Sequence, residues 1–211
     1  MADAGSTIQP TGVPQLRCPR CWFPAPMVPV AALNFRCSRC EWTFALAAPS
    51  LSAAPAFPAT TVAVANPYAT PVAAAIAANG ATITNVSVSG ATAGTGAGTY
   101  VIPAGGTISC TYTVATPTWT WALPVTSASA SAGGTSLTFA PTGTNAAFAQ
   151  GQVLIVDPAG TSDVVTVSGT PTATSVPVNS LNSAHNSGVS VTVASLTPAL
   201  SSVEAVPATA Y

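Results

Sequence analysis

The sequence predicts a mainly β protein with an N-terminal zinc-ribbon module, an extended linker and one or two small antiparallel β-sandwich or barrel domains. Three observations predict it. Two Cys-x-x-Cys pairs lie near the N-terminus, and a segment rich in proline and alanine follows them. From Asn66 onward, short runs of alternating apolar and hydroxyl residues are separated by Gly, Pro and Asn turns. Short strands with frequent turn signals are typical of sandwiches and small barrels.

The predicted organisation divides the 211 residues into six segments. In order they are an arm (1–15), the zinc ribbon (16–46), the linker (47–65), a first β domain (66–124), a second β domain (125–198) and a tail (199–211). Prolines at positions 49, 55 and 58 favour an extended linker over a helix. The sequence leaves open whether the two β units form one sandwich or two.

The metal site is predicted from cysteine spacing. Cys18 and Cys21 form one pair, Cys37 and Cys40 the other, and residues 22–36 separate them, which is typical of a four-thiolate zinc site. About thirty residues bury too little apolar surface to fold alone, so a metal is expected as a staple. Disulfides, an iron centre and a thioredoxin-like redox pair are the alternatives. Four cysteines leave no open coordination position, so the predicted site is structural rather than catalytic.

All the basic residues of the chain lie in or beside the two cysteine pairs. They are Arg17, Arg20, Arg36 and Arg39. Zinc held by four thiolates carries a formal charge of about −2, which nearby arginines would offset. The alternative is a zinc ribbon that contacts nucleic acid. The −2 centre and Glu41 leave little net positive charge, which favours charge compensation over a nucleic-acid surface.

The composition points to an assembly component. Only 4% of residues are charged, against about 25% in ordinary globular proteins, and the net charge is −1. Such a chain has no electrostatic steering towards DNA or membranes, and a near-neutral surface favours association. The first fifteen residues do not resemble a secretion signal, and no apolar run is long enough to span a bilayer. We therefore expect synthesis in a reducing cytoplasm.

The first β domain begins with a predicted hairpin. Residues 71–78 and 81–90 are candidate strands joined by Asn79 and Gly80, the strongest short-range hairpin signal. A short helix is the alternative for the alanine-rich first arm. Residues 91–99 read as a Gly/Thr loop, and residues 100–102 as the next strand.

The strand predicted at residues 107–114 has two distinct faces. Ile108, Cys110, Tyr112 and Val114 share one of them, so Cys110 is predicted to be a buried small hydrophobe. After it, Trp119 and Trp121 are two residues apart and share one face of a strand. They are interpreted as a lid over the sheet core; the alternatives are an aromatic patch at a subunit contact or a glycan site.

The second β domain contains five predicted strands, at residues 135–140, 151–157, 162–169, 174–178 and 188–196. The run Asp-Pro-Ala-Gly at 157–160 predicts a turn between two of them. The apolar run VLIV indicates a strand covered on both sides. In the last strand, Val189, Val191 and Val193 alternate with Ser190 and Thr192, which predicts one apolar and one hydroxyl face.

No catalytic constellation is evident in the sequence. His185 is the only histidine, and a lone loop histidine is more often a turn or packing residue than a base. The carboxylates are scattered, and only Asp157 and Asp163 are brought together, by the turn that joins them. No nucleophile elbow, phosphate loop or HExxH motif occurs. We therefore expect no enzymatic activity.

Parts of the β region resemble a known family. The stretches NPYATPVAAAIAANGATITNVSVSG, GTYVIPAGGTISCTYTVATPTWTW, FAQGQVLIVDPAGTSDVVTVSG and NSAHNSGVSV are similar to accessory capsid (head decoration) proteins of tailed bacteriophages, over residues 66–196. In that family β domains decorate the outer capsid, often as oligomers at symmetry points. The N-terminal ribbon is not part of that pattern.

The resemblance implies a non-enzymatic virion protein on the capsid surface, made in the host cytoplasm. Its partners would be the major capsid protein and copies of itself, with no nucleic acid or membrane. The alternatives are a minor tail component, a glycan-binding adhesin and, less favoured, a zinc-ribbon nucleic-acid-binding factor.

Overall fold

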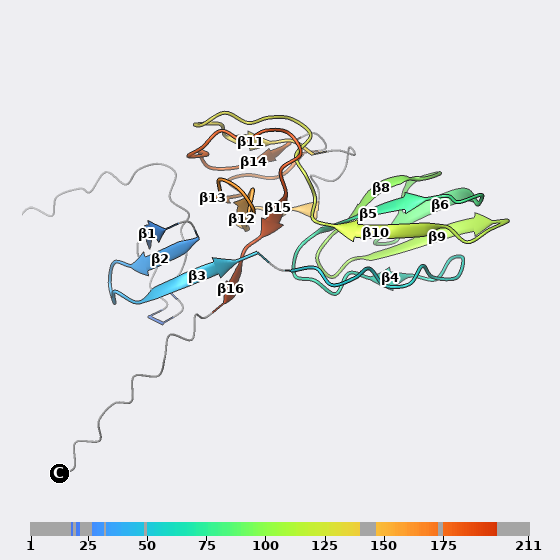
Figure 1. The fold of residues 1–211 in the computed structure, drawn as a ribbon, viewed down its shortest axis with the longest axis horizontal. Helices are drawn as coiled ribbons and strands as arrows, with labels where there is room; N and C mark the ends of the chain where they lie inside the picture. Colours follow the sequence, from blue (N-terminus) through green and yellow to red (C-terminus); the bar gives the residue numbers. More distant parts are fainter. Residues whose placement is uncertain are drawn as a thin grey trace, which may run out of the picture.

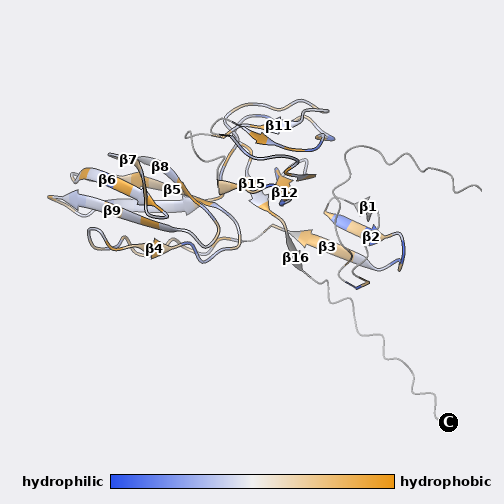
Figure 2. Cartoon of the chain, turned by 180° about the vertical axis from the view of Figure 1, so that it is seen from behind, coloured by the Kyte–Doolittle hydropathy of each residue, from blue (hydrophilic) through white to orange (hydrophobic). Residues whose placement is uncertain are grey.

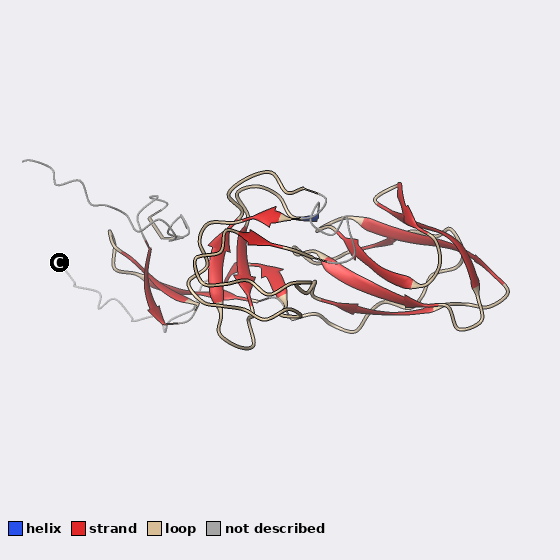
Figure 3. Cartoon of the chain, turned by 90° about the horizontal axis from the view of Figure 1, so that it is seen from above, coloured by secondary structure: helices blue, strands red, loops and turns tan. Residues whose placement is uncertain are grey.

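The computed structural model describes residues 18, 20–21, 27–31, 33–48, 50–139, 147–172 and 175–197. These residues form strands and loops, with a short 3₁₀ turn at residue 147 and no α-helix, which confirms the predicted mainly β fold (Figure 3). The predicted arm (1–15) and tail (199–211) lie outside the described residues. Figure 1 shows three units along the longest axis: the ribbon (described residues from 18 to 48) at one end, β domain 1 (50–122) at the other, and β domain 2 (125–193) between them.

β domain 1 is a sandwich of two antiparallel sheets, ordered β10-β5-β8 and β4-β9-β6-β7. Its strands are β4 (Val64–Ala65), β5 (Val72–Ala77), β6 (Thr82–Val88), β7 (Ala91–Gly94), β8 (Gly98–Ile102), β9 (Thr107–Thr113) and β10 (Thr118–Ala122). Alternate residues of each sheet point inward, for example Ala74 and Ile76 on β5 and Ile108 and Cys110 on β9. The two inner faces thus make one apolar core.

The turn at Asn79 and Gly80 forms as predicted, but the hairpin does not. Both residues have positive φ, 48° and 85°, and the amide of Ala81 donates to the Ala78 carbonyl at 2.9 Å. However, β5 pairs with β8 and β10, whereas β6 pairs with β7 and β9. The prediction of a paired hairpin is therefore wrong. The turn chemistry reverses the chain, but burying the apolar faces of β5 and β6 against each other places them in opposite sheets. The predicted loop 91–99 also contains the short strand β7.

The predicted faces of β9 and β10 are correct except at one position. Cys110 is fully buried, and Trp119 and Trp121 are each 9% exposed within the core. Val114 was predicted on the same buried face, but it is 89% exposed. The chain turns there, since Val114 has a φ of 77° and the Ala115 amide donates to the Thr113 carbonyl. The alternation of β9 therefore ends at Thr113.

The predicted linker is extended, and much of it packs on β domain 1. Residues 51–61 of the linker form a strap that packs against the core of β domain 1. The indole Nε1 of Trp119 donates to the Pro55 carbonyl at 2.8 Å, and the hydroxyl of Tyr112 donates to the Pro58 carbonyl at 3.0 Å. The Phe57 ring lies 4.6 Å from that of Trp119. The strap covers the Trp119 face, so this indole is a core residue rather than part of an exposed aromatic patch.

β domain 2 has shorter strands and more loop than β domain 1. The strands of β domain 2 are β11 (Ser136–Leu137), β12 (Val153–Val156), β13 (Asp163–Thr166), β14 (Val176–Pro177) and β15 (Val191–Val193). They form sheets ordered β13-β12-β15 and β11-β14. The predicted turn at 157–160 is confirmed, because the Gly160 amide donates to the Asp157 carbonyl at 3.1 Å and β12 pairs with β13.

The strand β12 is covered on both sides, as the VLIV run predicts. Leu154 and Val156 point into the core of β domain 2, whereas Ile155 points towards the ribbon, and all three are fully buried. Figure 2 shows hydrophobic colouring on this strand, between the other two units. On the neighbouring strand β13, Val165 likewise packs in the core of β domain 2, and Val164 packs in the cluster shared with the ribbon.

The two β domains are joined by buried hydroxyl groups. The sequence predicts one apolar and one hydroxyl face for the last strand, and Thr192 on the hydroxyl face is fully buried. Its Oγ1 lies 3.1 Å from Oγ1 of Thr70, and the Val193 amide donates to the same Thr70 oxygen at 3.0 Å. At Thr192 the hydroxyl face of this strand therefore meets β domain 1.

Candidate metal centre

The ribbon is a small antiparallel sheet ordered β1-β2-β3-β16. Its strands are β1 (Met27–Ala31), β2 (Asn34–Cys37), β3 (Thr43–Ala47) and β16 (Ser195–Thr197). On β2, Phe35 and Cys37 are buried while Asn34 and Arg36 are exposed, which is the alternation of a half-buried strand. The fourth strand comes from the far end of the chain. The pairing of this strand with the ribbon sheet is not predicted by the sequence analysis.

The second cysteine pair lies on a tight turn that follows β2. The Glu41 amide donates to the Cys37 carbonyl, and the Cys37 amide donates to the Trp42 carbonyl, both at 2.9 Å. Glu41 has a φ of 57°, which lets the chain reverse within a few residues. This turn holds Cys37 and Cys40 on the same side as Cys18 and Cys21.

The four predicted cysteines come together. The Sγ atoms of Cys18 and Cys40 are 3.5 Å apart, those of Cys21 and Cys37 are 3.7 Å apart, and all four lie within 4.8 Å of one another. A disulfide would bring two sulfurs to about 2.05 Å, so these thiols are free. A tetrahedral centre with metal–sulfur bonds of about 2.3 Å has its sulfurs about 3.8 Å apart. The cluster can therefore hold a metal ion.

The electrostatics of the cluster favour one thiolate. Burial raises the pKa of Cys37, but the amides of Cys40 and Arg39 and the neighbouring thiols donate to its sulfur and lower the pKa to about 6. For Cys40, the amide of Trp42 lowers the pKa, while burial and the neighbouring sulfurs raise it to about 11. Cys37 is therefore the thiol of this pair that loses its proton more easily, and Cys40 is the one that holds it more tightly. A bound cation would displace such protons, which couples metal binding to proton release.

The described arginines lie at the surface of the ribbon. Arg20, Arg36 and Arg39 are all exposed, and Arg17 lies outside the described residues. The backbone amide of Arg39 contributes directly to the cluster through its bond to the Cys37 sulfur. Their predicted role in offsetting the charge of a four-thiolate metal centre remains a prediction.

The apolar core beneath the cysteines is shared with β domain 2. It contains Cys18, Phe35, Cys37, Phe44 and Leu46 from the ribbon, together with Ile155 and Val164 from β12 and β13. The rings of Phe35 and Phe44 are 6.0 Å apart and stacked. The sequence predicts a zinc ribbon that an extended linker separates from the β domains. The structure instead packs the four-cysteine cluster against a second unit.

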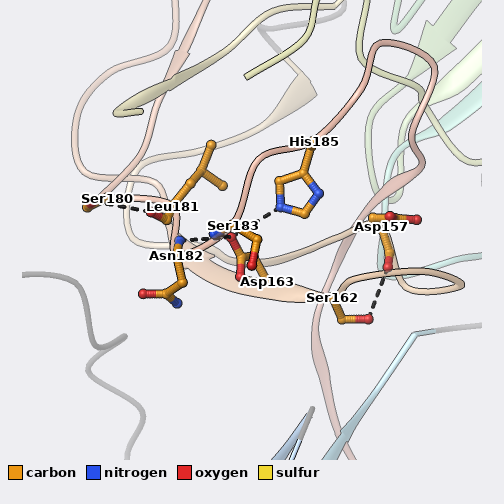
Figure 4. Close-up of polar contacts among 8 residues, drawn as sticks. All are labelled: Asp157, Ser162, Asp163, Ser180, Leu181, Asn182, Ser183 and His185. Carbon is orange, nitrogen blue, oxygen red and sulfur yellow. Dashed lines mark hydrogen bonds and ion pairs between the residues drawn. The ribbon is translucent and has the colours of Figure 1, made fainter. Parts of the chain in front are cut away.

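The other concentration of polar side chains lies in β domain 2 (Figure 4). Nε2 of His185 is 3.1 Å from Oδ2 of Asp163, and this oxygen also accepts the amides of Asn182 and Ser183 at 2.9 Å. Both side chains are buried, and Nδ1 of His185 has no partner. This arrangement ties a loop to β13, so His185 is the packing residue that the sequence predicts. Its pairing with Asp163, 22 positions away, was not foreseen.

Comparison of the chain with protein-family models, curated proteins and solved structures finds no match. Among the described residues, no helix has the length and apolar character needed to cross a membrane. The fold and the site therefore define the class: a protein of small β modules with a four-cysteine centre able to bind a metal.

Proposed function

We propose that the four cysteines bind one structural Zn²⁺ and that the protein is a non-enzymatic component of a virion, a capsid decoration protein that binds the major capsid protein and copies of itself on the capsid surface. The observation that carries the proposal is the absence of charge from the β sandwich. No Asp, Glu, Lys, Arg or His occurs between Glu41 and Asp157.

Zinc fits the donor set better than the hard cations do. The four ligands are sulfurs, with spacings close to those of a tetrahedral thiolate centre. Calcium and magnesium prefer oxygen ligands. Four sulfurs fill the coordination sphere, so bound zinc would stabilise the ribbon and have no position for a substrate. Elemental analysis of the purified protein tests this proposal. The expected result is one zinc per chain; iron, or no metal, would contradict it.

The neutral sandwich suits a protein present in many neighbouring copies. The outward face of the sheet β10-β5-β8 presents small side chains, with Thr120 opposite Ala75 and Ala75 opposite Thr99, all exposed. Figure 2 shows pale and orange strands in β domain 1, whereas β2 of the ribbon carries strongly hydrophilic positions. Identical charged surfaces packed side by side would repel one another, and this surface avoids that repulsion.

The polar chemistry of the described residues supports a non-enzymatic role. The buried pair of Asp163 and His185 bonds to backbone amides and to each other. No hydroxyl or thiol bonds to either ring nitrogen of His185 in the described chain. A nucleophile–base arrangement needs such a contact.

Association with particles is the decisive experiment. The protein is expected to copurify with assembled capsids in a fixed copy number. Its binding should change little between about 0.1 and 1 M salt, because a neutral interface has few ion pairs to screen. A nucleic-acid-binding ribbon would instead lose affinity steeply with salt. Absence from the particles would refute the capsid role.

A charge introduced on one face of the sandwich tests whether that face contacts the capsid or neighbouring copies. Ala75→Glu places a carboxylate in the exposed face of β10-β5-β8, and Thr84→Glu places one on exposed β6 of the other sheet. If one face meets neighbouring copies or the capsid, the variant on that face should lower the copy number while the other serves as its control.

A further inference from the structure

The ribbon and β domain 2 share more than a surface contact. Five ribbon residues and two from β domain 2, Ile155 and Val164, form one buried cluster. Two of its members, Cys18 and Cys37, are also metal-ligand candidates and are fully buried. The sulfurs that would bind the metal therefore form part of the apolar contact between the two units.

The backbone joins the same two units. Ser195, Leu196 and Thr197 of β16 pair with Ala47, Leu46 and Ala45 of β3. Directly before them, β15 pairs with β12, and the Ala194 amide donates to the Val153 carbonyl at 2.8 Å. One continuous segment, 191–197, thus completes a sheet in β domain 2 and then adds the last strand to the ribbon (Figure 1).

We propose that metal binding at the four cysteines latches β16 and β domain 2 onto the ribbon, and that loss of the metal releases the C-terminal strand. This inference rests on the proposed metal binding. The physical reason is the small size of the ribbon. β2 has four residues and β3 has five, and so short a pair is not stable by itself in water.

The metal would act through Cys37 and Cys40. It would fix the turn between β2 and β3, and with it the edge of β3 on which β16 pairs. Without the metal, the turn is held by hydrogen bonds alone, and Cys18 meets Cys40 only through the contact between their sulfurs. The ribbon residues that cover Ile155 and Val164 are then no longer held in place.

Thermodynamic linkage makes the inference testable from the opposite side. If the metal strengthens docking of β domain 2, docking must strengthen metal binding by the same factor. Val164 and Val165 form a natural matched pair for this test. They are adjacent on β13 and both buried, but Val164 packs on the ribbon cluster and Val165 on the core of β domain 2.

The first measurement is hydrogen exchange in the full-length protein, with zinc bound and after chelation. The amides of residues 195–197 are expected to exchange at least about tenfold faster without zinc, because local opening then costs less free energy. The amides of β9 in β domain 1 are the internal control and should be unchanged. Exchange at 195–197 that is the same with and without zinc would overturn the inference, and so would equal acceleration at β9.

The second measurement is zinc affinity, by competition with a chromogenic chelator. Val164→Ala is expected to weaken zinc binding about threefold to tenfold, because it removes packing from the shared cluster. Val165→Ala should lower the stability of β domain 2 and leave zinc affinity unchanged. Equal zinc affinity for the two variants would overturn the inference.

The two proposals fail in different ways. If the full-length protein binds zinc but β16 is not protected, the latch is refuted and the zinc site stands. If the protein binds no zinc, both the zinc site and the latch are refuted.

Discussion

The ribbon and β domain 1 are both small β structures, but they form their cores in different ways. β domain 1 encloses a cluster of eleven buried residues, all from its own strands, and closes it with its own strap. The ribbon contributes five residues to a cluster of seven, and two of those five are the cysteines Cys18 and Cys37. The rest of its core comes from β domain 2.

The difference follows from chain length and from how much apolar surface each region can bury. Small units bury a small fraction of their surface and need a metal, disulfides or a neighbour. The ribbon has both the sulfurs for a metal and a neighbour, whereas β domain 1 folds on apolar contacts without any charged residue. We therefore expect the two regions to respond to different perturbations.

The largest expected effect is the loss of the metal. Structural zinc in small domains contributes on the order of 10 kcal/mol of folding free energy at pH 7. Cys37→Ser or chelation should therefore unfold the ribbon while β domain 1 stays folded. In nitrogen-15 NMR spectra, the indole signal of Trp42 should move and those of Trp119 and Trp121 should stay.

Cys110→Ser is the matched control, since it changes a buried cysteine that lies outside the cluster. This variant should retain the full zinc content. Movement of the Trp119 and Trp121 signals after chelation would contradict the independence of β domain 1.

The next effect should appear in β domain 1 and spare the ribbon. Trp119→Ala removes a buried indole, its hydrogen bond to Pro55 and its contact with Phe57. We expect a loss of about 3–5 kcal/mol in the free energy of unfolding of this domain, measured by urea denaturation, with unchanged zinc content. Thr120→Ala, at the exposed neighbouring position, should change stability by less than about 0.5 kcal/mol.

β domain 2 extends the comparison because it relies on a buried polar pair. Asp163→Asn replaces a carboxylate that accepts two backbone amides and faces Nε2 of His185. The loss in unfolding free energy should be about 1–3 kcal/mol, because these donors then face a neutral and weaker acceptor. Asp157→Asn, at a half-buried turn position, is the control for loss of charge. Equal losses of unfolding free energy in the two variants would show that the burial of Asp163 adds nothing to its contribution to stability.

The smallest expected effect is at the joint between the two β domains. Thr70→Val removes the hydroxyl that lies beside Thr192 and accepts the Val193 amide. We expect a cost of about 1 kcal/mol, seen by calorimetry as less cooperative unfolding of the two domains. Thr99→Val, at an exposed position on β8, should leave the thermogram unchanged. A thermogram of Thr70→Val identical to that of the unchanged protein would mean that the joint adds no coupling.

The sequence by itself determined the features that depend on local spacing. The separation of the cysteine pairs was enough to predict their convergence, and the parity of Cys110, Trp119 and Trp121 was enough to predict their burial. The VLIV run predicted a strand covered on both sides, and the 157–160 turn was also correct. These signals come from residues a few positions apart, where backbone geometry allows few alternatives.

Only the tertiary structure decided what each buried face meets. A period of two shows that a face is covered, but it does not identify the neighbour that covers it. For that reason the sequence did not predict that β5 and β6 would lie in opposite sheets, or that Thr192 would meet Thr70. The pairing of β16 with β3 depends on residues about 150 positions apart, and their contact is set by the packing of the whole chain.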